Sequence, residues 1–142
     1  MSSPRARYKE LLRSLFKGDA EEAQRIADEL GDASWEGTGQ LVMAVFGVAV
    51  DRRFKEDSSH AAVMGFVGEL SETYSSAEVV FNPLYAELLL RSALGEDQLF
   101  QQVPGDEATA LMVSMADKIV VDLGLSDDEI DELLDEAEAL IA

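Results

Sequence analysis

The feature that most constrains this chain is a charge-free run over residues 37–50, GTGQLVMAVFGVAV, in a sequence whose formal net charge is −18. Spanning a bilayer takes about 20 apolar residues. This run is shorter, is interrupted by Gly39 and Gly47, and has charged residues close to both ends. Because residues 41–50 are apolar on every face of a helix, we expect other helices to surround this one. The run therefore predicts the centre of a core and no association with a membrane.

Apolar residues recur at spacings of three and four along nearly the whole chain, and the alternating runs typical of strands are almost absent. This spacing predicts amphipathic α-helices. A chain of 142 residues with 47% hydrophobic residues has the size and composition of one globular domain. We therefore predict an all-α, single-domain bundle over residues 1–142, in which about six to eight helices surround a central apolar helix over residues 35–54.

Several helix boundaries are marked by capping residues. Asn82-Pro83 combines a side chain that caps a helix with a proline suited to the first helical position. Ser126 and Glu129 have the spacing of a capping box before an amphipathic last helix. Gly124 is expected to end the preceding helix. These residues predict where two of the later helices begin.

Glycines also occur inside the predicted helices, including Gly65 and Gly68. A glycine in a helix interior costs about 1 kcal/mol relative to alanine. Such residues indicate either a close approach of two backbones or an opened surface, and we interpret them as sites of close packing.

Composition excludes several classes of function. The chain has no cysteine, which excludes disulfides, thiolate metal sites and cysteine nucleophiles. Its 29 acidic residues against 11 basic ones produce a negative field that disfavours DNA or RNA as a partner. The first residues carry charges and lack the apolar segment of a secretory signal, so we expect a cytoplasmic protein.

The sequence also lacks the common catalytic motifs. It contains no G-x-S-x-G, Walker or H-E-x-x-H pattern. His60 is the only histidine and lies in helical register with Val63 and Val67, so we interpret it as a partly buried packing or capping residue. The carboxylates of the tail are not followed by an EF-hand loop, which favours a solvated helix face. We therefore predict no catalytic residue, no cofactor and no metal site.

Charge is distributed unevenly, with a basic head and an acidic tail. The cations recur every four residues on one face of the first helix, at Arg5, Lys9, Arg13 and Lys17. The corresponding acids of the last helix are Asp127, Asp128, Asp131 and Asp135. A basic stripe is typical of helices that bind anionic surfaces, but a body of charge −18 is repelled by such a surface. We therefore interpret both sets as interaction residues and predict that the stripe docks on the chain's own acidic helix or on that of a dimer mate.

Several short features are spread from the middle of the chain to its tail. They are Trp35, Arg52-Arg53-Phe54, Phe66-Val67, Asn82-Pro83, Glu87, Arg91, Leu94-Gly95 and the acidic last helix. In these features the chain resembles a group of short, acidic, helical proteins from actinobacteria that have no assigned activity. The resemblance implies a helical fold and an actinobacterial source, and it implies no catalytic residue.

These observations favour a protein-interaction module that forms a homodimer or binds a basic partner, with an inhibitor or immunity-type protein as its more specific form. A negative field speeds the encounter with basic partners. The alternative is a small-molecule binder with an apolar pocket between the third, fourth and fifth helices. The expected lining of that pocket is Phe46, Met64, Phe66, Phe81 and Tyr85. An enzyme is a third hypothesis, and it would need convergent carboxylates or a partner for His60.

Overall fold

The computed structural model describes residues 4–30, 38–75 and 82–141, and this part of the chain contains helices and no strand. The predicted all-α fold is confirmed. The elements are α1 (Pro4–Phe16), α2 (Ala20–Leu30), α3 (Thr38–Arg53), α4 (His60–Ser75), α5 (Pro83–Ala93), the 3-10 helix η1 (Asp97–Gln102), α6 (Gly105–Leu123) and α7 (Asp127–Leu140).

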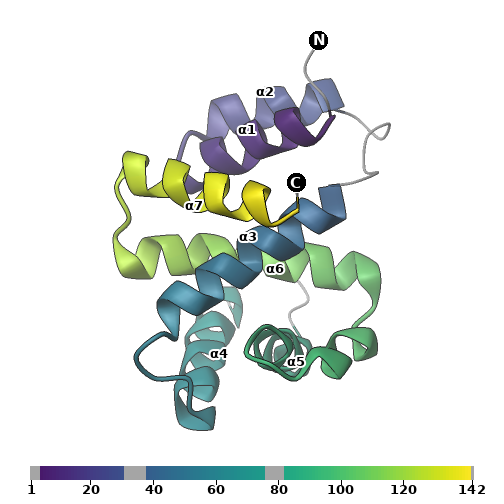
Figure 1. The fold of residues 1–142 in the computed structure, drawn as a ribbon, viewed down its shortest axis with the longest axis vertical. Helices are drawn as coiled ribbons and strands as arrows, with labels where there is room; N and C mark the ends of the chain where they lie inside the picture. Colours follow the sequence, from purple (N-terminus) through teal and green to yellow (C-terminus); the bar gives the residue numbers. More distant parts are fainter. Residues whose placement is uncertain (1–3, 31–37, 76–81, 142) are drawn as a thin grey trace.

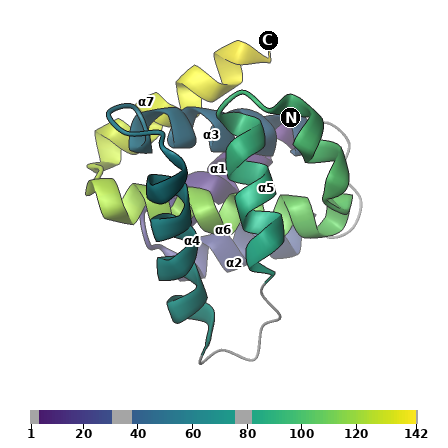
Figure 2. The same ribbon diagram turned by 90° about the horizontal axis from the view of Figure 1, so that it is seen from below.

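Helix α3 crosses the middle of the molecule (Figure 1) and packs against α6 and α7, with further contacts to α1 and α5. The pair α1 and α2 lies at one end of the molecule and the pair α4 and α5 at the other (Figure 1), and the view from below in Figure 2 shows α4 and α5 side by side. The buried side chains of the described residues form one cluster to which every α-helix contributes. The central helix predicted from the charge-free run is therefore present.

The central helix is not enclosed on every face, and here the sequence-based expectation is wrong. Leu41, Ala49 and Val50 are completely buried, whereas Gln40 is exposed and Met43 is 46% exposed. The apolar run thus contains one outward face, because no other element of the described chain covers it. Residues 35–37, the first part of the predicted helix, lie outside the described residues. Within the described chain, no helix is long and apolar enough to cross a membrane.

The predicted caps are confirmed. Asn82 Oδ1 accepts hydrogen bonds from the backbone N–H groups at the start of α5, the shortest from Leu84 at 3.0 Å. Ser126 Oγ accepts from the N–H of Glu129 at 3.2 Å, and the Glu129 carboxylate accepts from the N–H of Ser126 at 3.0 Å. Gly124 ends α6 with φ 61°, a left-handed conformation that favours glycine. These local interactions fix where α7 begins and so position its acidic residues.

The glycines inside the helices do not mark close packing, so that interpretation is wrong. A Cβ atom added at Gly47, Gly65 or Gly68 would meet no other atom within 4 Å. The second interpretation of these residues, an opened surface, fits the structure. Gly65 and Gly68 lie on the exposed side of α4, and Gly47 lies on the outward face of α3.

Candidate interaction surfaces

The three residues of the basic stripe whose side chains are described, Lys9, Arg13 and Lys17, pair with the acidic side of α7. Lys9 Nζ lies 2.6 Å from Asp135 Oδ1, and Arg13 Nε lies 2.7 Å from Asp131 Oδ1. Lys17, which directly follows α1, also reaches Asp131, with 3.3 Å between Nζ and Oδ1. We call this set of contacts the α1–α7 seam. Of the two docking arrangements expected from the sequence, the structure contains the one within a single chain.

The seam shifts the pKa values of Lys9 and Asp131 toward their charged forms. Burial lowers the pKa of Lys9, but the hydrogen bond to Asp135 and the negative charge of Glu138 outweigh this effect, and the net shift is upward. Desolvation raises the pKa of Asp131, but hydrogen bonds from Lys17 and Arg13 outweigh it, and the net shift is downward. Opposite charges within the chain therefore neutralise both sides of the seam.

The outer face of α7 carries carboxylates that do not take part in the seam. Asp127 and Asp128 are exposed in the first turn of α7, and Glu132 is exposed about one turn further along the helix. No ion pair joins these three side chains to any cation within the described part of the chain. We call these three exposed acids the α7 outer face, although Asp127 precedes Asp131 by four residues and therefore lies on the same side of the helix as the seam. Arg5, the remaining predicted interaction residue, lies in α1, and its side chain falls outside the described part.

Most cations outside the stripe also form ion pairs within the chain. Arg52 Nη2 lies 2.9 Å from Glu136 Oε2, and Lys118 Nζ lies 2.8 Å from Glu69 Oε2. Lys55 is the one lysine or arginine with a described side chain that has no ion pair to another described residue. The other cations in ion pairs are Arg7, Arg25, Arg53 and Arg91. The unneutralised charge on the described surface is therefore almost entirely negative.

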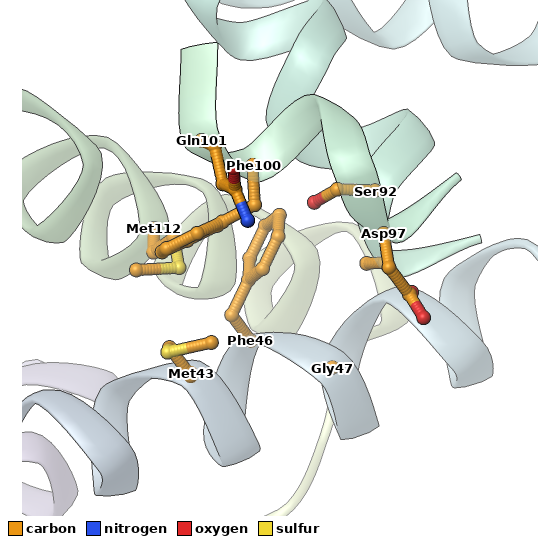
Figure 3. Close-up of a pocket in the computed structure, with 9 residues that line it drawn as sticks. Met43, Phe46, Gly47, Ser92, Asp97, Phe100, Gln101 and Met112 are labelled. Atoms are coloured by element: carbon orange, nitrogen blue, oxygen red, sulfur yellow. The ribbon is translucent and has the colours of Figure 1, made fainter. Parts of the chain in front are cut away.

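A cavity of about 270 Å³ opens between α3, α5, η1 and α6. The rings of Phe46 and Phe100 and the thioethers of Met43 and Met112 surround it, as Figure 3 shows. This volume lies just below the range of about 300–1,000 Å³ that is typical of ligand pockets. The other lining residues are Gly47, Ser92, Ala93, Asp97 and Gln101.

A second, more open hollow of about 540 Å³ lies where α3 meets the end of α7. Its lining consists of Gln40, Met43, Ala44, Gly47, Leu140 and Ile141. Met43 and Gly47 line both this hollow and the cavity, so the two are neighbours on the outward face of α3. We call the two together the α3 groove. Its lining is largely apolar, with Gln40, Ser92, Asp97 and Gln101 as polar members, and it includes the exposed side chains of Met43 (46%) and Leu140 (69%).

The predicted pocket residues are dispersed. Phe46 lines the cavity, and Phe81 lies outside the described residues. Phe66 packs edge to face on Phe54, with ring centroids 5.7 Å apart, because the buried side of α4 turns it into the core. The other predicted residues that do not line the cavity are Met64, which is exposed on α4, and Tyr85, which is half-buried on α5.

Apart from Phe46, the α3 residues that line the groove were not predicted, because nearly all residues around them are apolar. A signal was nevertheless present. Gln40, Met43 and Gly47 of the run, with Asp51 directly after it, fall on one helical face at spacings of three, four and four, and this face carries a polar, a flexible, a small and a charged residue. Such a stripe in an otherwise buried helix indicates the face that lacks a packing partner.

His60 is exposed, so the expected partial burial is wrong. It is the first residue of α4 and lines an open hollow of about 430 Å³ together with Arg91 and Glu96. Arg91 Nε donates a hydrogen bond to Glu96 Oε2 at 2.7 Å, which lowers the pKa of that carboxyl. Among the described residues, no three His, Asp or Glu side chains are grouped so that they could hold a metal ion.

No protein-family model matches this chain, and no curated protein or solved structure is significantly similar to it.

Proposed function

We propose that this protein is a non-enzymatic interaction module that binds a basic partner protein. The observation that carries the proposal is the internal neutralisation of the basic stripe. Its three described cations are occupied by Asp131, Asp135 and Glu138, while the α7 outer face forms no ion pair with the described residues. A surface with unneutralised charge of one sign attracts partners of the opposite sign.

The seam also bears on the choice between a dimer mate and a different partner. A mate that accepted the cations of the stripe would have to replace ion pairs that already exist within each chain, such as Arg13 with Asp131. The apolar side of α1 is unavailable as well, because Leu12 and Phe16 are buried in the chain's own core. A partner that supplies its own cations needs no such rearrangement, which favours a basic protein over a second copy.

The test is capture of a partner from a lysate of the source organism with the full chain as bait, followed by elution with salt and identification by mass spectrometry. The informative variant neutralises the α7 outer face, with Asp127→Asn, Asp128→Asn and Glu132→Gln. A matched control makes the same change in net charge at other exposed acids, with Glu21→Gln, Asp28→Asn and Glu56→Gln.

We expect one basic protein to bind the wild-type chain and the control, to be lost from the α7 variant, and to elute at moderate salt because exposed charges are screened. Equal loss from both variants would mean that net charge alone attracts proteins, and the proposal would fail. Recovery of no partner, or of the protein itself alone, would also contradict it.

The cavity favours a second candidate function, the binding of a small molecule with an apolar body and a positive charge. Phe46, Phe100 and Met112 supply an apolar lining, and Asp97 places a carboxylate at the same cavity. This arrangement suits a small aromatic or aliphatic cation, because rings and thioethers contact its body and the carboxylate its charge. A thermal-shift screen of such amines against wild type and Gly47→Leu tests this alternative. An amine that raises the melting temperature of wild type but not of Gly47→Leu would support this function. If no amine raises the melting temperature of wild type, this function is excluded.

A further inference from the structure

The α3 groove presents apolar surface that the described residues of this chain do not cover. Met43 and Leu140, from α3 and α7, are both exposed, although each lies next to a hollow with an otherwise largely apolar lining. Methionine side chains are flexible and polarizable, and they adapt to apolar partners of different shape. The groove contains Met43 at its centre and Met112 in the cavity. Its side chains are therefore suited to packing against an apolar partner.

Gly47 forms a notch in the middle of the groove. A Cβ atom at this position would meet no atom within 4 Å, so the absence of a side chain serves no contact within the described chain. Glycine here costs about 1 kcal/mol relative to alanine, because it increases the flexibility of the unfolded chain. The notch allows a partner's side chain to approach the backbone of α3. Gly47 lines the cavity and the hollow alike, so one side chain over the notch would contact both.

The charges around the groove are negative. Asp97 lines the cavity, and Asp51 follows Gly47 by one turn on the same face of α3. Neither carboxylate forms an ion pair within the described residues. Among the cations whose side chains are described, none lines either part of the groove. An apolar segment with cations at its edges would therefore complement both the surface and its rim.

The walls of the groove favour a helical partner. They are built from α3, α5, α6, α7 and η1, and the described chain has no strand to which an extended peptide could add. Helix-in-groove recognition uses apolar anchors that are three or four residues apart. A second copy of this chain is not the occupant, because its own basic helix α1 buries Leu12 and Phe16.

We infer that the α3 groove binds an amphipathic, cationic helix of the partner, with an apolar anchor over Gly47 and lysine or arginine side chains toward Asp51 and Asp97. This inference rests on the proposed function, since it names where and how the basic partner binds. It adds an apolar contact that the acidic surface by itself does not provide.

The test uses a labelled synthetic peptide of about 18 residues, long enough for helix formation, with leucines at one-turn spacing and lysines on the other faces. A scrambled peptide of equal composition lacks the apolar stripe, and it serves as the control for charge alone. Binding to the full chain is measured by fluorescence anisotropy. Methyl-labelled methionine NMR locates the peptide, because Met43 and Met112 line the groove while Met64 is exposed on α4.

The matched variants are Gly47→Leu, which fills the notch, and Gly65→Leu, which adds the same side chain at an equally open helical position. Neither change introduces a contact with existing atoms at its Cβ, so both variants are expected to fold. We expect Gly47→Leu to weaken peptide binding about tenfold, equivalent to about 1.4 kcal/mol. Gly65→Leu should leave binding unchanged. When the peptide is added to the wild-type chain, the NMR signals of Met43 and Met112 should shift, and the signal of Met64 should not.

Equal binding by Gly47→Leu and wild type, or equal binding of the scrambled peptide, would overturn the inference. The inference would also be overturned if peptide binding were not saturable, or if only the NMR signal of Met64 shifted on addition of the peptide. The captured partner separates this failure from failure of the proposed function. If that partner is lost from the α7 variant but retained by Gly47→Leu, the groove inference falls and the proposed function stands.

Discussion

The α1–α7 seam and the α3 groove share one helix, because α7 contributes Asp131 and Asp135 to the first and Leu140 to the second. The seam holds the most conspicuous charges of the sequence, and the structure neutralises them within the chain. The groove consists of residues with no conspicuous pattern, and it stays open. A conspicuous sequence pattern therefore need not mark a binding surface, since its residues can pair with other residues of the same chain when it folds.

The ion pairs of the seam and the buried leucines contribute different amounts to the free energy of unfolding. Ion pairs near the surface contribute little, about 0–1 kcal/mol, because water and salt screen them. Burying an apolar side chain contributes more, about 1.5–3 kcal/mol for a leucine. The seam should therefore set how α1 is oriented on α7, while the leucines beneath it hold the two helices in the fold.

The largest expected effect compares two leucines of α7. Leu133 is completely buried, and Leu140 is 69% exposed in the groove. We expect Leu133→Ala to lower the free energy of unfolding by about 2–5 kcal/mol, because it leaves a cavity in the core. Leu140→Ala should change it by no more than about 0.5 kcal/mol. Urea denaturation followed by circular dichroism measures both, and similar losses would show that the groove side of α7 is not open.

A smaller effect is expected from the glycines. Gly47→Ala should raise the free energy of unfolding by about 0.5–1 kcal/mol, because alanine favours the helix and its Cβ meets no atom here. Gly124→Ala is the contrasting control, since its φ of 61° should make the same substitution destabilising by about 1–2 kcal/mol. Thermal denaturation compares the two. A destabilised Gly47→Ala protein would mean that this position is packed within the chain.

The smallest effect is expected from the seam itself. Asp131→Asn should lower the free energy of unfolding by less than about 1 kcal/mol at pH 7, and by less still at high salt. The pKa of Asp131 is lowered in the folded chain, so its stabilisation is present above the ordinary value of 3.8 and is lost as pH falls through the lowered value. The difference from wild type should therefore disappear in acid.

Denaturant titrations at pH 7 and in acid, each at low and high salt, measure this dependence. A loss that exceeds that of Leu133→Ala, or that persists when Asp131 is protonated, would contradict the assignment of the seam as a weak, charge-based contact.

Much of the fold could be predicted from local sequence. The helical periodicity, the cap at Asn82 and the capping box of Ser126 with Glu129 depend on residues close in the chain, and the structure contains them all. Predictions that depended on distant neighbours did less well. His60 is exposed where partial burial was expected, and the helical glycines face open space where close packing was expected.

The candidate surfaces divide in the same way. The sequence by itself determined that the chain is helical, that its net charge is −18, and that a basic head and an acidic tail could attract each other. Tertiary structure decided that Lys9, Arg13 and Lys17 meet α7 of their own chain, and that Met43 and Gly47 face outward. The reason is that periodicity fixes which residues share a helix face, whereas only the packing of helices decides which face is covered.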